Sequence, residues 1–184
     1  MKKLFLTVAF VVVASAGFAR GSTNKIGAYV GLPIGLSYTR SMSNLIDFDF
    51  VAGFDVVRSG FFAAGEVLNV RLAPLFKVFK TPVDSASGTL SLGPALGIHF
   101  GTYWWAYYYN NENPFTGGFS VMLPLRFEFD FNTPFSLFLE LVPLGVQVSF
   151  FRTYYSDGYG NTQSRIVTPV GYYFSGGVGL RYRF

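Results

Sequence analysis

Cysteine is absent from this chain of 184 residues, and charged residues are scarce. Asp, Glu, Lys and Arg together make up 13% of the sequence, against about 25% in ordinary soluble domains. Without cysteine, neither a disulfide framework nor a cysteine-ligated metal site can form, so burial and hydrogen bonding must hold the fold together. The shortage of charge argues against an ordinary soluble domain.

Long apolar segments are missing as well. The longest runs from Leu4 to Val13 and has ten residues, whereas a membrane-spanning helix needs about 20. In the rest of the chain apolar residues alternate with Gly, Ser, Asp or Arg, although 51% of all residues are hydrophobic and 20% are aromatic. High hydrophobicity without long apolar runs is typical of a membrane β-barrel and not of a bundle of membrane helices.

The amino terminus has the features of a secretory signal. Two lysines precede the apolar run, and Ala14-Ser15-Ala16 follows as a cleavage site, with Gly17-Phe18-Ala19 as a second candidate. A membrane anchor is the alternative, but the run is too short and no cysteine follows it for lipidation. We therefore expect residues 1–19 to be a signal peptide cleaved after Ala16 or Ala19, and residues 20–184 to form one β-barrel domain.

The last part of the chain has the clearest pattern. From Val170 to Phe184 every second residue is apolar or glycine, and the residues between them, apart from Tyr173, are small or charged. A period of two over fifteen positions predicts a β-strand whose two faces meet different surroundings. One face suits lipid, and the other suits a narrow polar lumen.

Seven segments show this alternation: 25–39, 45–57, 66–78, 89–100, 117–131, 135–150 and 168–184. The roughly 165 residues left after signal removal fit eight strands of about 9–11 residues with their loops. We therefore predict an all-β fold, an eight-stranded antiparallel up-and-down transmembrane barrel, with seven strands clear and the eighth inferred. The eighth requires a turn at Gly31-Leu32-Pro33-Ile34-Gly35, which would split segment 25–39. The unbroken alternation of that segment favours one long strand instead, and the sequence leaves the choice open.

Segment 135–150 changes phase in its middle. Leu137, Leu139 and Leu141 alternate in one register, and the apolar residues from Leu144 to Phe150 alternate in the other. Because a slip of one residue turns every side chain to the opposite face, we predict a β-bulge at Val142-Pro143. With this bulge, the side chain of Glu140 points inward.

Five prolines fall inside the predicted strands: Pro33, Pro74, Pro94, Pro124 and Pro143. Proline cannot donate a ladder hydrogen bond, and a closed barrel has no edge strand to accommodate it. We therefore expect each proline at a bulge, a strand end or a local kink.

Loop lengths orient the predicted barrel. Long connections are expected at 101–116 and 151–168, a medium one at 79–88, and short ones at 41–44, 58–65 and 132–134. Small bacterial barrels have short periplasmic turns and longer outer loops, so Phe184 and residues 132–134 are expected at the periplasmic rim. The long outer loops then hold a group of aromatic residues: Trp104, Trp105, Tyr107, Tyr108, Tyr109, Tyr154 and Tyr155. Such rings suit an interfacial girdle, or alternatively a recognition surface or a mouth that admits apolar molecules.

The leader, the alternating strands and the final sequence Gly179-Leu180-Arg181-Tyr182-Arg183-Phe184 resemble small outer-membrane β-barrels of the OmpA transmembrane-domain and OmpW type. Residues 123–145, LPLRFEFDFNTPFSLFLELVPLG, are similar to a stretch found in OmpW-like barrels. The resemblance implies a place in the bacterial outer membrane, in contact with its lipid. It also implies that the barrel-assembly machinery recognises a signal formed by Gly179, Leu180, Tyr182 and Phe184. It says little about activity, because such barrels have porin-like, structural, adhesive and enzymatic functions.

Charged residues on the expected inner face are the most chemically informative set. They are the acids Asp47, Asp49, Asp55, Glu128, Asp130 and Glu140 and the bases Arg71, Lys77, Arg126, Arg181 and Arg183. An eight-stranded barrel is just wide enough to be filled by side chains, and buried charges must be paired. We expect a network of ion pairs in place of an apolar core. A charge-lined conduit for a small solute and a ligand or catalytic site are the alternatives.

His99 is the one histidine of the chain, and we expect it to be a satisfied polar residue in the lumen. Barrel enzymes use His with Ser and an acid, but Phe100 and Gly101 follow His99, so a His-x-Ser motif is missing. Asp84-Ser85 falls in an expected periplasmic turn, on the wrong side for surface lipid chemistry. Carboxylates alone could bind Ca²⁺, but pairing with nearby bases is the simpler account. We predict no catalytic residues, no metal and no cofactor.

These observations predict a barrel that is not an enzyme and has a structural or surface-exposed role. Its outer loops are the expected contact sites for a host or envelope ligand. The alternative is an OmpW-like channel for small apolar solutes, which would enter at the aromatic loops and leave sideways near a proline kink. Without Lys2 and Lys3 the chain has 12 basic and 10 acidic residues, an excess too small to suggest nucleic acid as a partner.

Overall fold

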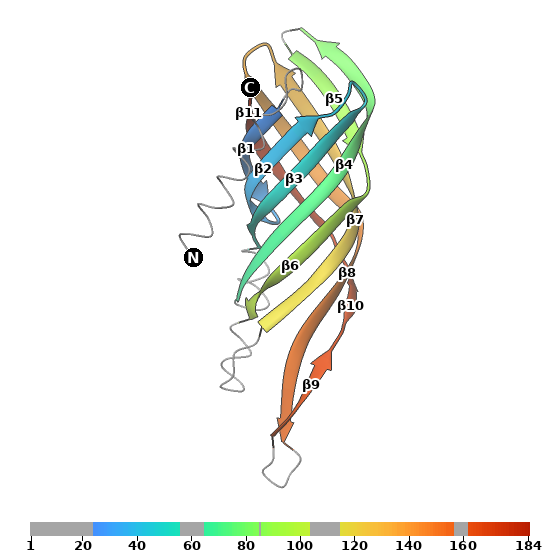
Figure 1. The fold of residues 1–184 in the computed structure, drawn as a ribbon. Helices are drawn as coiled ribbons and strands as arrows, with labels where there is room; N and C mark the ends of the chain where they lie inside the picture. Colours follow the sequence, from blue (N-terminus) through green and yellow to red (C-terminus); the bar gives the residue numbers. More distant parts are fainter. Residues whose placement is uncertain (1–23, 56–64, 85, 104–114, 157–161) are drawn as a thin grey trace.

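The computed structural model describes residues 24–55, 65–84, 86–103, 115–156 and 162–184 (Figure 1). The expected signal peptide, residues 1–19, and its cleavage sites lie outside these ranges. Within them, no helix is long and apolar enough to cross a membrane. The strands are β1 (Asn24–Gly31), β2 (Ile34–Ser41), β3 (Ile46–Phe54), β4 (Gly65–Val83), β5 (Ala86–Leu92), β6 (Ala95–Tyr103), β7 (Phe115–Phe131), β8 (Phe135–Ser156), β9 (Thr162–Val167), β10 (Val170–Tyr172) and β11 (Ser175–Arg183).

These strands form one closed antiparallel barrel. β11 pairs with β8 on one side and with β1 on the other, which joins the end of the chain to its beginning. β5 and β6 are successive pieces of one wall strand, because both lie between β4 and β7. β9, β10 and β11 are likewise pieces of the last wall strand, and all three pair with β8. The wall therefore has eight strands, and the predicted fold is confirmed.

The eighth strand exists because segment 25–39 contains a turn, the possibility that the sequence left undecided. Segment 25–39 is divided between β1 and β2, with Leu32 and Pro33 between them. Tyr29 pairs with Gly35, and Ala28 pairs with Leu36. Directly paired residues share a face. In each of these pairs the two residue numbers differ by an even number. The alternation therefore passes through the turn unchanged, which is why the pattern resembled one long strand.

The predicted β-bulge in β8 is confirmed. Leu123 of β7 pairs with Leu144, and Leu125 pairs with Leu141. Two steps along β7 thus correspond to three along β8, and the extra residue lies at Val142-Pro143. Leu141 and Leu144 both lie exposed on the outer face as a result, and Glu140 is buried.

The prolines occupy irregular positions, as predicted. Pro33 lies in the β1–β2 turn, Pro94 lies between β5 and β6, and Pro143 lies in the bulge, with Pro124 opposite it. Pro74 is inside β4, at the point where the partner of β4 changes from β6 to β5. Each proline therefore lies where the ladder is already interrupted, so its missing N–H breaks no regular pair.

Several predicted connections are wrong. The medium connection 79–88 is a tight hairpin, because β4 runs to Val83 and β5 begins at Ala86. The long connection 151–168 is mostly strand, since β8 continues to Ser156 and pairs with β9 as a ribbon beyond the barrel (Figure 1). A ribbon outside the membrane has no lipid-facing side, so its sequence needs no apolar alternation. Segments 89–100 and 168–184 are also interrupted, at residues 93–94 and 173–174.

The two rims of the barrel differ. Phe184 lies at the rim that also has residues 42–45, Asp84 and residues 132–134, here called the C-terminal rim (Figure 1). The β1–β2 turn and the β8–β9 ribbon lie at the opposite rim. Short connections lie at the C-terminal rim, as expected, but the opposite rim also has a short one, the turn at Leu32-Pro33.

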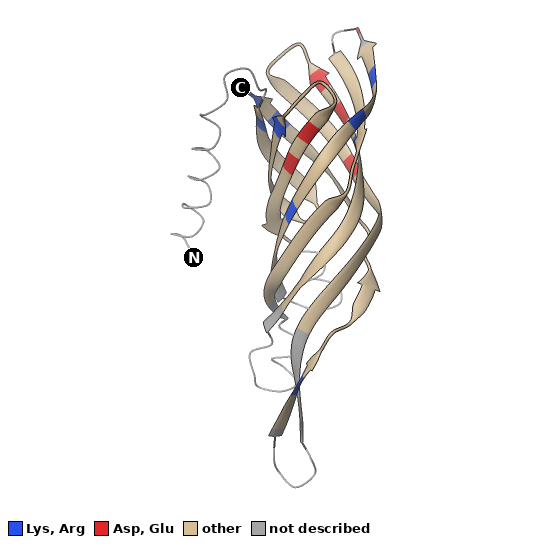
Figure 2. Cartoon of the chain, turned by 45° about the vertical axis from the view of Figure 1, so that its right-hand side comes forward, with Lys and Arg blue, Asp and Glu red and all other residues tan. Residues whose placement is uncertain are grey.

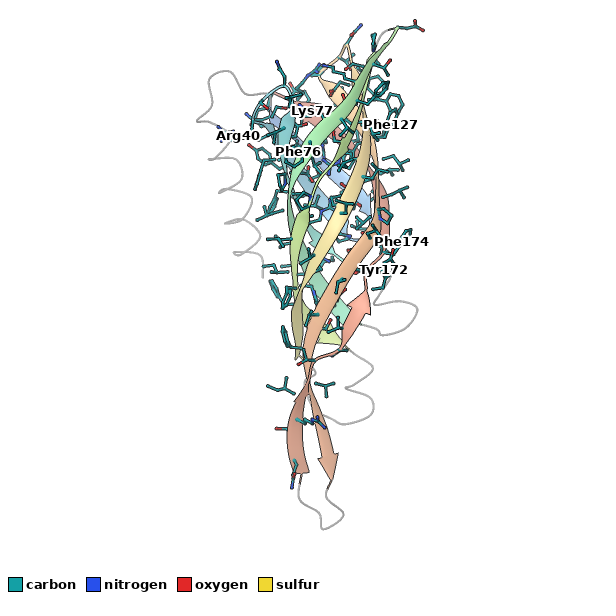
Figure 3. The ribbon with its side chains drawn as sticks, turned by 90° about the vertical axis from the view of Figure 1, so that its right-hand side faces the viewer. Arg40, Phe76, Lys77, Phe127, Tyr172 and Phe174 are labelled. Atoms are coloured by element: carbon teal, nitrogen blue, oxygen red, sulfur yellow. The ribbon has the colours of Figure 1, made fainter. Side chains whose placement is uncertain are left out.

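The outer face of the wall is apolar. Leu137, Leu139 and Leu141 of β8 are between 44% and 49% exposed, whereas Phe138 and Glu140 between them are fully buried. The same alternation covers the other wall strands (Figure 3). An exposed apolar surface of this extent suits contact with lipid and not with water.

Candidate functional site

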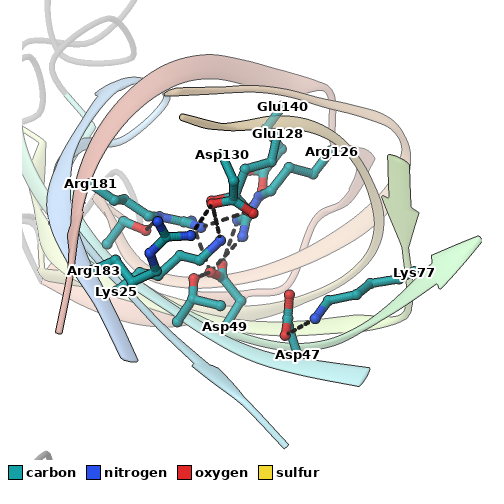
Figure 4. Close-up of polar contacts among 12 residues, drawn as sticks. Lys25, Asp47, Asp49, Lys77, Arg126, Glu128, Asp130, Glu140, Arg181 and Arg183 are labelled. Atoms are coloured by element: carbon teal, nitrogen blue, oxygen red, sulfur yellow. Dashed lines mark hydrogen bonds and ion pairs between the residues drawn. The ribbon is translucent and has the colours of Figure 1, made fainter. Parts of the chain in front are cut away.

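Charged residues gather in the part of the barrel toward the C-terminal rim (Figure 2). They come from β1, β3, β4, β7, β8 and β11, and their side chains meet inside the barrel (Figure 4). We call the following residues the charged cluster: Lys25, Asp49, Arg71, Arg126, Glu128, Asp130, Glu140 and Arg181. The alternation of each strand turns these residues to the inner face, and barrel closure brings the strands together.

Asp49 is the centre of the charged cluster. Its two carboxylate oxygens accept hydrogen bonds from Nη1 and Nη2 of Arg126, both at 2.6 Å. Nη2 of Arg181 donates at 3.0 Å, and the hydroxyl of Thr39 donates at 2.6 Å. Nη2 of Arg71 lies 3.7 Å away. One carboxylate therefore interacts with three arginines from three different strands.

Glu140 is the second centre. It accepts hydrogen bonds from Nε and Nη2 of Arg126, at 3.1 and 2.5 Å, and lies 2.6 Å from Nη2 of Arg71. The hydroxyl of Tyr29 also donates to it, at 3.2 Å. Arg126 thus bridges Asp49 and Glu140 with both edges of its guanidinium group, a geometry that arginine provides and lysine does not.

The remaining ion pairs lie toward the rim. Lys25 contacts Glu128 at 3.1 Å and Asp130 at 2.6 Å. Nη1 of Arg181 lies 3.6 Å from Glu128. Arg183 lies 3.9 Å from Asp130 and is partly exposed. Lys77 and Asp47 form a separate pair at 2.7 Å.

Burial of the cluster is complete at its centre. Asp49, Glu140 and Arg181 are 0% exposed, and Arg126 is 1% exposed. These side chains are therefore out of contact with solvent. Charges so deeply buried are tolerated only when paired and hydrogen-bonded.

Two aromatic rings support the arginines. Tyr29 and Phe138 stack with centroids 5.8 Å apart. The Cζ atoms of Arg181 and Arg126 lie 3.8 and 4.6 Å from the centroid of Phe138, within the range of a cation–π interaction. A Cβ atom at Gly179 would lie 2.1 Å from the Phe138 ring, so the glycine makes room for this ring.

All eleven charged residues predicted for the inner face are described. Ten of them lie on the inner face of strands, and Asp55 is buried just after β3. Sequence reasoning missed Lys25, Tyr29 and Phe138. The residues around Lys25 and Tyr29 were interpreted as glycine and serine alternation, and an inward aromatic residue among leucines gives no polar signal.

An apolar cluster fills the interior beside the bulge. It consists of Ala73, Leu75, Ala95, Met122, Val142 and Tyr173. On β7 and β8, these residues follow the charged ones in the direction of the opposite rim. Their position coincides with the interruptions at residues 93–94, 142–143 and 173–174.

His99 is buried beyond the apolar cluster. Its Nε2 lies 3.2 Å from the Ser149 hydroxyl and 3.1 Å from the side-chain nitrogen of Gln147. Gln147 also donates to Ser149 at 3.0 Å. A hydrogen-bonded polar group of this kind fits the expectation of a satisfied histidine. Among the described residues, no group of three or more His, Cys, Asp or Glu could hold a metal ion.

The residues of the expected assembly signal lie in the strand that closes the barrel. Leu180, Tyr182 and Phe184 are about half exposed on the outer face, and Gly179 faces inward against Phe138. Of the predicted loop aromatics, Trp104, Trp105 and Tyr107 to Tyr109 lie outside the described residues. Tyr154 and Tyr155 belong to β8, paired with Ser164 and Gln163 of β9.

No family model matches this chain, and no curated protein matches it. Among solved structures, it is similar to a major outer membrane protein from Thermus thermophilus, with 15% identity and a TM-score of 0.52, over 89% of this chain and 98% of that one. A second match is Ail, the attachment invasion locus protein of Yersinia pestis, with 14% identity and a TM-score of 0.37, over 89% and 97%. The first likeness shows the fold alone, and the fold is the barrel expected from the sequence.

Proposed function

We propose that this protein is an integral outer-membrane barrel with a closed, charge-filled lumen and a structural or surface-exposed role. The observation that carries the proposal is the complete burial of Asp49, Arg126, Glu140 and Arg181 across the interior. A barrel whose cross-section is filled by paired charges offers no open path for a solute. In this account the charged cluster replaces the apolar core that a soluble domain would have.

The outer parts of the chain are the proposed contact sites. The β8–β9 ribbon extends past the opposite rim and includes Tyr154 and Tyr155. Aromatic residues are frequent anchors at interfaces, which supports a contact with a host or envelope ligand there. The remaining proposed partners are outer-membrane lipid along the apolar wall and the barrel-assembly machinery at the terminal signal. The proposal includes no enzymatic activity, no cofactor and no nucleic acid.

A liposome-swelling assay tests the closed lumen. Liposomes with the refolded barrel should swell in sugar and amino-acid solutions no faster than liposomes without protein. Heat-modified migration on a gel supplies the control for correct folding. Swelling at a rate that rises with the amount of folded barrel would refute the proposal.

A second candidate function has one observation in its favour. The apolar cluster lies directly behind the wall interruptions at Pro94, Pro143 and Tyr173. A wall with missing ladder hydrogen bonds opens more easily than a regular one, which suits an OmpW-like channel that releases small apolar solutes sideways.

Because the chain lacks cysteine, a reversible lock can distinguish the two functions. Val146 of β8 pairs directly with Tyr172 of β10, so Val146→Cys with Tyr172→Cys ties the two wall strands together on oxidation. The channel predicts that uptake of a fluorescent apolar solute falls in the oxidised form and recovers on reduction. The closed barrel predicts no uptake in either form.

A further inference from the structure

Arg40 is an exception on the apolar outer face of the barrel. It pairs with Phe48 of β3 and with Asn24 of β1, and paired residues have their side chains on the same face. Phe48 is 42% exposed on the outer face. Among the side chains that the structure describes, Arg40 is the one charged group that the pairing register places on this face of the barrel.

Two other polar groups accompany it. The hydroxyl of Tyr38 donates to Oδ1 of Asn24 at 3.0 Å, and Asn24 is the ladder partner of Arg40. Asn24 is held at the C-terminal rim by backbone hydrogen bonds with Phe184, at 3.2 and 2.9 Å. An amide, a phenol and a guanidinium group therefore lie on neighbouring positions of the first two strands, and Arg40 is labelled in Figure 3.

The guanidinium group of Arg40 lacks a partner within the described part of the chain. It forms no ion pair with any carboxylate of the described ranges, in contrast to the arginines inside the barrel. Its Nε is buried and has no hydrogen-bond partner there. An unsatisfied buried donor destabilises the fold. The side chain as a whole is partly exposed, so an acceptor from outside the chain can reach it.

The surroundings of Arg40 are those of a membrane interface. Met42 and Leu45, in the turn after β2, are 63% and 67% exposed. Phe48 and Phe184 lie nearby on the outer face, and aromatic rings favour the headgroup region of a bilayer. The anion available at that depth is a lipid phosphate, which arginine binds with two parallel hydrogen bonds.

We propose that Arg40 and Tyr38 bind the headgroup of an anionic phospholipid, in the leaflet next to the C-terminal rim. Arg40 contacts the phosphate and Tyr38, which is partly exposed, contacts phosphate or glycerol oxygens. Asn24 is buried, at 4% exposed, and holds the Tyr38 hydroxyl in place. The acyl chains lie along the outer face past Leu36 and Ala28, which pair with each other on β2 and β1. An anionic headgroup is preferred because a choline cation would be repelled by the unpaired arginine.

Native mass spectrometry of the folded barrel tests the site. The protein in detergent is mixed with phosphatidylglycerol, phosphatidylcholine or inorganic phosphate, and the retained adducts are counted. Wild type should retain one phosphatidylglycerol, and Arg40→Gln should retain it about tenfold less, the loss expected for a charge-assisted hydrogen-bonded contact. Tyr38→Phe should show a smaller loss. Lys80→Gln is the matched control, because Lys80 is exposed near the same rim and outside the proposed site.

Several results would overturn the proposal. Equal retention by wild type and Arg40→Gln would exclude the site. Equal retention of both lipids by wild type would exclude the anionic preference. Retention of inorganic phosphate at the level of the lipid would show an ion site and not a lipid site.

Discussion

The inner face of β7 and β8 is charged on the C-terminal side of the bulge and neutral beyond it. On the first side, Arg126 and Glu140 belong to the charged cluster and lie in its fully buried centre. On the second side, Met122 and Val142 pack in the apolar cluster, followed by Gln147 and its neutral partners. Both stretches are buried, but they are held by different physics. Removing one partner of a buried ion pair leaves the other charge unpaired and strongly destabilises the fold. Removing an apolar or neutral side chain also lowers stability, but it leaves no unpaired charge.

The two clusters also differ in the regularity of the wall strands around them. The wall around the charged cluster has one irregularity, a register shift between Lys77 and Phe79 of β4, while the apolar cluster lies behind three interruptions. If any part of the wall opens, it is the part beside the apolar cluster. In the proposed closed barrel, the charged cluster therefore blocks the lumen, and any lateral movement takes place on the neutral side.

Removing one arginine from the charged cluster should lower the stability of the barrel most strongly. Arg126→Ala leaves Asp49 and Glu140 without their shared partner, and loss of one member of a buried pair costs about 3–5 kcal/mol. Thermal unfolding in detergent micelles should show a large decrease in midpoint, with little change in permeability. A large rise in conductance with unchanged stability would contradict the filled lumen.

Gly179 tests the aromatic support of the charged cluster. A methyl group at Gly179→Ala would collide with Phe138, which cannot move easily because Tyr29 and two arginines pack against it. Overpacking of this kind costs about 1–3 kcal/mol. Gly171→Ala is the matched control, since its Cβ would meet nothing within 4 Å. Equal unfolding midpoints for the two variants would show that Phe138 yields freely.

The neutral side should tolerate change better. Gln147→Leu removes hydrogen bonds to His99 and Ser149 but leaves no charge unpaired, so we expect a loss of about 1 kcal/mol. Urea unfolding from lipid vesicles measures this loss, with Arg126→Ala unfolded under the same conditions for comparison. A loss as large as that of the arginine variant would remove the distinction between the two stretches.

The smallest effect is expected at the rim. Lys77 and Asp47 form an ion pair in which the lysine side chain is 19% exposed and the aspartate side chain 6%, so we expect its loss to cost about 1 kcal/mol, the upper end of the range for exposed pairs. Lys77→Ala should therefore lower the unfolding midpoint slightly, and added salt should reduce the difference from wild type. A loss that is large and insensitive to salt would place this pair with the buried cluster.

Much of the fold could be predicted because lipid imposes a strict pattern on one face of each strand. The phase change between Leu141 and Leu144 located the bulge to the residue. The β1–β2 turn stayed undecided because its pairing preserves parity. The β8–β9 ribbon was interpreted as a loop because strands outside the membrane need no such pattern.

The sequence predicted which charged residues lie in the site, but not which of them contact one another. The alternation turned Asp49, Arg126 and Glu140 inward, yet their contacts depend on the stagger of strands from distant parts of the chain. Tyr29 and Phe138 were missed because an aromatic residue on the inner face resembles one that faces lipid. Arg40 was missed because a single charge near a strand end resembles a solvated turn residue.

Single-channel recording in a planar bilayer tests the central claim, the closed lumen, most directly. The refolded wild-type barrel should give no stable conductance step at moderate voltage, because Arg126, Arg181, Asp49 and Glu140 fill the cross-section. A reproducible, stable step from correctly folded wild-type protein would contradict the account.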